Sequence, residues 1–122
     1  MKDSKILLVD DETEFVSTLA ERLNLRGFDV NVATDGESAI QIVEESQPNL
    51  IILDLKMPGL GGLEVLKQVK EINPDIKVIL LTGHGSTKEG IEGMNLGASD
   101  YLMKPINIEE LIPKMQEAID KG

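Results

Sequence analysis

The 122-residue sequence predicts an α/β protein of the (βα)5 doubly wound type, in which a five-stranded parallel sheet carries helices on both faces. Short apolar segments alternate along the chain with segments that have helical spacing. Most of the apolar segments are continuous, which is typical of strands that are buried on both faces. Strict alternation of strands and helices favours parallel strands, because each helix returns the chain to the same end of the sheet.

The expected strands are short and rich in Ile, Leu and Val. Four of them are continuous apolar runs, and the second in chain order is a weaker alternating segment. In order they are KILLV (5–9), FDVNVA (28–33), NLIIL (49–53), KVILL (77–81) and YLM (101–103).

The segments between these strands repeat apolar residues every three or four positions, which is the spacing of one helical face. The fourth expected helix lies in STKEGIEGMNLG (86–97). The repeating residues of the others are Phe15, Leu19 and Leu23 in the first, Ala39, Ile40 and Val43 in the second, Leu63, Leu66 and Val69 in the third, and Leu111, Ile112, Met115 and Ile119 in the last.

Glycine, proline and capping residues set the expected ends of these helices. Gly27 closes the first helix, Pro48 follows the second, and Pro74 follows the third. Asn107, with Glu110 three residues later, resembles a capping box that opens the last helix.

The last two helices contain residues that disfavour a helix. Gly90 and Gly93 each cost roughly 1 kcal/mol relative to Ala in the fourth helix. Pro113, inside the fifth, costs roughly 3 kcal/mol or forces a kink. Sequence drift on an exposed surface would explain them, and so would a corner that is held loosely for a functional reason.

Composition narrows the class of protein. Residues 1–122 fit one domain, and 41% hydrophobic residues are enough for a core. The 22 acidic against 12 basic side chains give a net charge of −10, which disfavours direct binding to nucleic acid or anionic membranes. The acidity fits solubility alone, and equally a cation or a basic partner. Cysteine is absent, and the apolar run before Asp10 is too short for a signal peptide, so we expect a cytoplasmic protein.

Polar residues follow four of the expected strands at the edge where such sheets bind ligands. They are Asp10 and Asp11 after the first, Asp54 after the third, Thr82 after the fourth and Lys104 after the fifth. Carboxylates can ligate Mg2+ and one can act as a nucleophile, while a hydroxyl and an ammonium can bind phosphoryl oxygens. This set suits phosphoryl transfer to a carboxylate. Taken singly, Asp11 or Glu12 could simply cap a helix.

Over residues 4–120 the chain resembles a two-component response-regulator receiver domain. The stretches that carry the resemblance are ILLVDDE (6–12), LIILDLKMPGLGGLEVL (50–66), VILLTGHGS (78–86) and LGASDYLMKP (96–105). The resemblance implies the strand order 2-1-3-4-5. It also implies a phosphorylation-dependent switch that accepts its phosphoryl group from a sensor histidine kinase or phosphotransfer protein and controls an output domain or partner, with homodimerisation on activation in some members. Such a domain is a regulatory phosphoacceptor that catalyses only its own phosphotransfer and dephosphorylation.

The resemblance assigns a cation and its ligands. Asp54 would be the phosphoacceptor, with Mg2+ or Mn2+ as cofactor. Asp11 would bind the cation directly, Asp10 mainly through water, and Lys56 through its backbone carbonyl.

Further roles are implied for the switch. Thr82 and Lys104 would bind the phosphoryl group, and Tyr101 would change rotamer. The Lys104–Pro105 bond would be cis, and the output surface would comprise the fourth helix, fifth strand and fifth helix.

Two flanking residues and three rival functions stay open at the level of sequence. The side chains of Lys56 and His84 either face solvent or set the lifetime of the acyl phosphate. A haloacid-dehalogenase-like phosphatase is disfavoured because position 56 is lysine instead of a second acid, and no G-x-x-x-x-G-K-[ST] nucleotide-binding loop follows any strand. A constitutive interaction module is the third rival. The sequence fits both a free-standing regulator and the N-terminal receiver of a longer protein.

Overall fold

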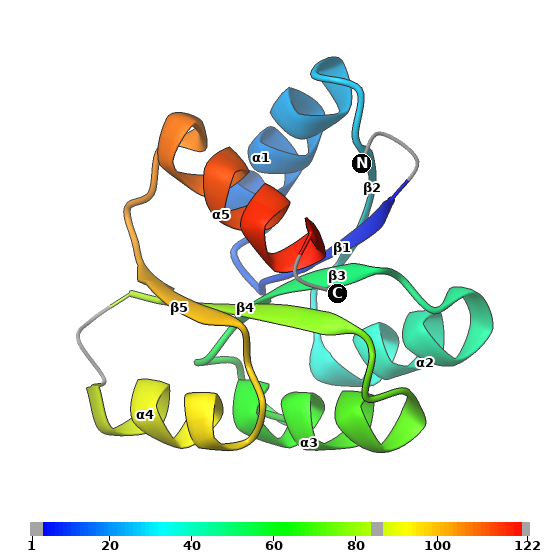
Figure 1. Cartoon of the computed structure of the whole chain (residues 1–122), viewed down its shortest axis with the longest axis vertical. Coiled ribbons are helices and arrows are strands. Elements are labelled where there is room, and N and C mark those ends of the chain that lie inside the picture. Colours follow the sequence, from blue (N-terminus) through cyan, green and yellow to red (C-terminus); the bar gives the residue numbers. More distant parts are fainter. Residues whose placement is uncertain (1–3, 84–86, 121–122) are drawn as a thin grey trace.

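The computed structural model describes residues 4–83 and 87–120, which form strands and helices in strict alternation (Figure 1). The elements are β1 (Lys5–Val9), α1 (Thr13–Leu25), β2 (Asp29–Ala33), α2 (Gly36–Ser46), β3 (Leu50–Asp54), α3 (Gly62–Ile72), β4 (Lys77–Thr82), α4 (Thr87–Asn95), β5 (Asp100–Met103) and α5 (Ile108–Asp120). Each predicted strand is confirmed to within a residue at either end.

The sheet is parallel throughout and has the order β2-β1-β3-β4-β5, as predicted. The first strand therefore lies between the second and third, and the direction of winding reverses there. In the pairing of β1 with β3, Val9 lies opposite Leu53. The residues that follow these two positions are consequently neighbours at the carboxyl edge of the sheet.

Both faces of the sheet are buried, because successive side chains of one strand point to opposite sides. Ile6 and Leu8 of β1 belong to the core beneath α1 and α5. Leu7 and Val9 belong to the core on the side of α2, α3 and α4. Figure 1 shows these two layers of helices on either side of the sheet. Continuous burial explains why the strands read as uninterrupted apolar runs.

The helix ends follow local backbone chemistry. Gly27 has φ +92° just after α1, a conformation that favours glycine. The predicted cap of α5 is confirmed: Asn107 Oδ1 accepts from the backbone amide of Glu110 at 2.9 Å, and Asn107 Nδ2 donates to the Glu110 carboxylate. Capping of α1 by Asp11 or Glu12 is wrong. Glu12 occupies the N-cap position without a side-chain capping bond, and its amide instead donates to Asp10 Oδ1 at 2.9 Å.

The glycines of α4 serve close packing, which their low helix propensity did not reveal. Gly90 and Gly93 are both buried. A Cβ atom at Gly90 would lie 2.6 Å from Cζ of Tyr101, so the helix can rest on that ring only because position 90 has no side chain. Pro113 does not end α5, which continues to Asp120. The proline is exposed, and water can reach the helix backbone there.

The start of α3 approaches the end of β3 very closely. A Cβ atom at Gly62 would lie 2.7 Å from Cα of Leu55, and its amide donates to the Leu55 carbonyl at 3.2 Å. The loop that follows Asp54 is therefore held against the first turn of α3. Neighbouring Gly61 is different, because a Cβ there meets no described atom within 4 Å.

Replacing Gly62 by Ala is expected to lower the free energy of unfolding by about 1–3 kcal/mol, because backbone must move to admit the methyl group. Urea denaturation followed by circular dichroism measures the change. Gly61→Ala is the matched control and is expected to cost less, about 0.5–1 kcal/mol, because alanine is a poorer N-cap than glycine but its methyl group meets no described atom. Equal stability of the two variants would contradict the packing argument.

Candidate functional site

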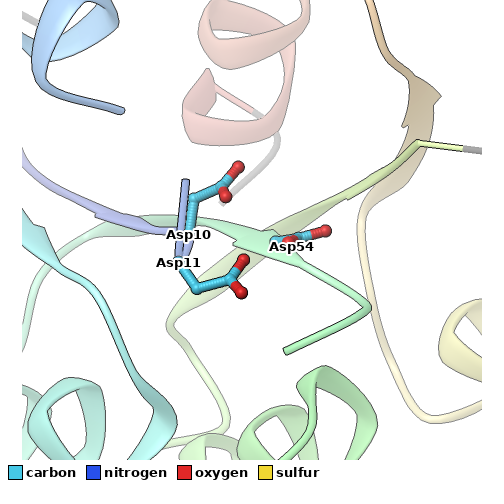
Figure 2. Close-up of side chains that lie close together, drawn as sticks. All are labelled: Asp10, Asp11 and Asp54. Atoms are coloured by element: carbon cyan, nitrogen blue, oxygen red, sulfur yellow. The ribbon is translucent and has the colours of Figure 1, made fainter. Parts of the chain in front are cut away.

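Three carboxylates meet at the carboxyl edge of the sheet. Asp10 and Asp11 follow β1, and Asp54 is the last residue of the adjacent strand β3. One carboxylate oxygen from each of the three residues lies within 4.8 Å of the other two. Figure 2 shows the three side chains. Asp10 and Asp54 are buried, with 2% and 4% of their surface exposed, whereas Asp11 is exposed. The predicted convergence of these residues is thus present.

Thr82 and Lys104 reach the same edge from β4 and β5. Thr82 is the last residue of β4 and is fully buried. The amide of Lys104 donates to the Thr82 carbonyl at 2.7 Å, which continues the pairing of the two strands beyond Met103. The Lys104–Pro105 peptide bond is cis, as the resemblance implies.

An open cavity of about 360 Å³ lies over this edge. It gives solvent and small solutes access to the otherwise buried Asp54. The residues that line it are Asp11, Glu12, Asp54, Lys56, Gly83 and Lys104.

The Lys104 ammonium is shared among carboxylates. Its Nζ lies 2.7 Å from Asp10 Oδ2, 2.6 Å from Glu12 Oε1 and 3.9 Å from Asp54 Oδ2. Burial alone would lower the pKa of this amine, but the surrounding carboxylates outweigh burial and raise the pKa. Lys104 is therefore a fixed cation at neutral pH.

The surroundings of Asp54 disfavour the ionised form of its carboxyl group. Burial raises the pKa of its carboxyl from 3.8 to about 6, and the neighbouring charge of Asp10 adds to the rise. Lys104 opposes this increase, as does the Lys56 amide, which lies 3.4 Å from Asp54 Oδ1. An additional positive charge at the site would favour the ionised form.

The donor set fits a hard divalent cation. The three clustered groups offer carboxylate oxygens, which Mg2+ prefers. Oδ2 of Asp10 is buried and accepts no hydrogen bond of normal geometry from the described residues, although the Lys104 ammonium is close to it. A buried oxygen with spare acceptor capacity is what a cation site provides.

The other predicted site residues lie around this centre. Lys56 has a mostly exposed side chain whose Nζ is 3.9 Å from Glu89 Oε1 on α4. Tyr101 is partly buried against the core under α4. His84 lies outside the described residues.

Sequence reasoning missed two contacts of Lys104. The sequence suggests Glu12 only as a possible helix cap, yet its carboxylate accepts a hydrogen bond from the Lys104 ammonium. Helical spacing predicts Phe15 only as part of an apolar helical face, yet its ring centroid is 4.7 Å from the same ammonium. The acidic run from Asp10 to Glu12 was the available signal for the first contact.

The fold and the site together define a receiver domain. The family model described as "Response regulator receiver domain" matches residues 6–116, and the chain belongs to this family. Response regulator MprA of Mycolicibacterium vanbaalenii is 37% identical over 112 residues, which cover 92% of this chain and 48% of that protein. The chain spans about half the length of the curated relatives it matches.

Solved structures agree with this assignment. The CheY-like response regulator receiver domain protein from Methanospirillum hungatei superimposes with a TM-score of 0.93 at 31% identity, covering 97% of this chain and 94% of that one. A response regulator protein from Burkholderia pseudomallei has a TM-score of 0.88 at 28% identity, covering 98% of this chain and 70% of that one. That structure contains a phosphorylated aspartic acid, a calcium ion and citrate.

Within the part of the chain that the structure describes, none of the helices has the length and apolar character needed to cross a membrane.

Replacing Asp54 by Asn is expected to stabilise the fold at neutral pH when divalent cations are absent. Because the folded-state pKa is raised from 3.8 to about 6, the folded protein holds this proton more tightly than the unfolded chain. Stability therefore falls as pH rises between about 4 and 6, and the penalty above that window is at most about 3 kcal/mol. Asn removes this penalty. Urea denaturation across this pH range measures the difference between the two proteins.

The difference in stability is expected to shrink as pH falls from about 6 and to vanish below about 4, where Asp54 becomes protonated in the unfolded chain as well. Asp75→Asn is the control, because it removes a carboxyl at an exposed position before β4 that does not line the cavity. Lower stability of Asp54→Asn than of wild type at neutral pH would contradict the electrostatic assignment.

Proposed function

We propose that this chain is a phosphorylation-dependent signalling switch, in which Asp54 accepts a phosphoryl group from a sensor histidine kinase or a phosphotransfer protein. The observation that carries the proposal is that three carboxylates, Lys104 and Thr82 meet at one edge of the sheet, beside an open cavity that exposes Asp54. The phosphorylated aspartic acid in the Burkholderia pseudomallei relative supports it. In this proposal residues 1–122 form one receiver unit, a regulatory phosphoacceptor instead of an enzyme that acts on a separate substrate.

The proposed reaction joins an Asp54 carboxylate oxygen to the phosphorus of a phosphohistidine. The bond between phosphorus and the imidazole nitrogen breaks, and the imidazole leaves with the bonding pair and takes up a proton. Asp10, Asp11, Asp54 and the Lys56 carbonyl would hold Mg2+ or Mn2+, which supplies positive charge for the phosphoryl oxygens when it is bound. Lys104, whose ammonium lies 3.9 Å from Asp54 Oδ2, contributes a further positive charge at the cavity.

The phosphoryl group would act as a switch through new hydrogen bonds to Thr82 and Lys104. Thr82 ends β4 and Lys104 directly follows β5, and both strands contact α4, so a shift of either residue can be passed to α4. Tyr101 lies directly against Gly90, and a change of its rotamer would alter the support of α4.

The proposed output surface is the face of α4, β5 and α5. Exposed apolar side chains support this choice, because Ile91, Met94 and Met103 are 58%, 42% and 50% exposed. Such a surface suits contact with an output domain, a separate protein or a second copy of the chain. The alternative is a constitutive interaction module, which would use the same surface without any phosphoryl group.

Beryllofluoride, an analogue of the phosphoryl group, is expected to bind in the presence of Mg2+ and to shift the backbone amide resonances of Thr82 and its neighbours. Two-dimensional ¹H–¹⁵N NMR measures the shifts. Asp54→Ala is expected to abolish them because it removes the acceptor, whereas Asp75→Asn retains them. Absence of shifts in the wild-type protein would favour the constitutive module.

Lys56→Ala and His84→Ala are each expected to change the dephosphorylation rate of the protein after it is loaded from a small-molecule phosphodonor. Lys56 lines the cavity, and loss of its side chain alters the approach of water to the acyl phosphate. Loss of radioactive phosphate with time measures the rate, and Lys88→Ala is the control because this exposed lysine lies outside the cavity lining. Rates equal to wild type would mean that neither side chain influences the lifetime.

A further inference from the structure

We infer that Glu12 is a positioning residue that holds the Lys104 ammonium in the resting state and competes with the phosphoryl group for it. The inference rests on the proposed role of Asp54 as phosphoacceptor. Glu12 thereby opposes formation of the phosphorylated state. Its carboxylate is a counterpart of Lys104, distinct from the three clustered carboxylates that suit a cation.

The distances place Lys104 on the side of the cavity that belongs to the segment between β1 and α1. The ammonium donates a hydrogen bond of 2.6 Å to Glu12 Oε1, whereas the nearest oxygen of Asp54 is 3.9 Å away. The 3.9 Å separation between Lys104 and Asp54 is too long for a hydrogen bond. In this state the directed bond of Lys104 therefore goes to Glu12 and not to the phosphoacceptor.

Phe15 strengthens the same resting position. The ammonium lies 4.7 Å from the centroid of its ring, within the range of a cation–π contact. Glu12 and Phe15 both come from the start of α1, so one segment provides an anion and an aromatic face for a lysine that is 92 residues from Glu12. The side chain of Lys104 is only 12% exposed as a result.

The contact with Glu12 is well suited to be exchanged. Asp10 is buried and fixed, but the side chain of Glu12 is 62% exposed and can turn into solvent without leaving a buried charge. Exposed ion pairs contribute little free energy each. A phosphoryl oxygen on Asp54 can accordingly displace Glu12 from Lys104. The displacement lowers the affinity of the protein for a phosphoryl analogue by a small, measurable amount.

Three variants separate contact from charge. Glu12→Gln removes the charge, and Glu12→Asp keeps the charge but shortens the side chain so that it no longer reaches Lys104. Glu14→Gln removes the same charge from an exposed residue on α1 that does not line the cavity. If contact matters, both Glu12 variants differ from wild type in the same direction and Glu14→Gln does not.

The first measurement needs no phosphoryl analogue. NMR of lysine ammonium groups is expected to show a slowly exchanging Lys104 signal in the wild-type and Glu14→Gln proteins, and faster exchange in both Glu12 variants. The second measurement is a titration with beryllofluoride and Mg2+. Both Glu12 variants are expected to bind the analogue about two- to fivefold more tightly than wild type, the range that an exposed ion pair provides.

Several outcomes would overturn the inference. A wild-type result for Glu12→Asp in both measurements would mean that charge acts without contact, and equal effects of Glu12→Gln and Glu14→Gln would mean the same. Weaker binding of Mg2+ alone by Glu12→Gln would make Glu12 a ligand of the cation. Wild-type protein that binds no beryllofluoride would overturn the proposed function of Asp54, whereas normal binding with an unchanged Lys104 signal in Glu12→Gln would overturn this inference alone.

Discussion

The arrangement at the sheet edge depends on one ion pair, the 2.7 Å contact between Lys104 and the buried carboxylate of Asp10. Asp54 lies buried beside the buried carboxylate of Asp10, and both desolvation and the charge of Asp10 raise the pKa of Asp54. A single ammonium, brought from the edge strand of the sheet, offsets part of that penalty. Loss of the Lys104 ammonium would leave uncompensated charge in the interior. Such a loss destabilises a fold far more than the loss of a surface ion pair.

The sheet makes this concentration of charge sustainable. Its strands are buried on both faces by two separate apolar cores, so the backbone that carries Asp10, Asp54 and Thr82 is fixed by packing well away from the charges. Close approach of α3 at Gly62 then holds the loop after Asp54. Rigid strands bring the charged groups together, and the open cavity leaves them accessible to a reactant.

Sequence reasoning succeeded where a residue's position follows from backbone periodicity. Continuous apolar runs predicted the strands. Because the carboxyl ends of parallel strands lie at one edge of the sheet, the strand ends also predicted that Asp10, Asp54, Thr82 and Lys104 lie close together. The order of the strands came from the family resemblance, because no local pattern encodes which strands are neighbours. Contacts between side chains from distant elements were missed for the same reason. The ring of Tyr101 packs against Gly90, but no pattern near Gly90 in the sequence predicts that contact.

The contact between Glu12 and Lys104, which the sequence did not predict, matters because phosphorylation of Asp54 would then replace one partner of Lys104 with another. Lys104 already lies within 4 Å of three carboxylates, so its charge is in use before any reactant arrives. A phosphoryl group on Asp54 brings additional negative charge, which competes with these carboxylates for the Lys104 ammonium. Asp10 cannot release the ammonium without a buried charge left behind, but the exposed Glu12 can. The contact with Glu12 is therefore the one that yields, because its release leaves no buried charge, and the strength of that contact sets how readily the switch responds.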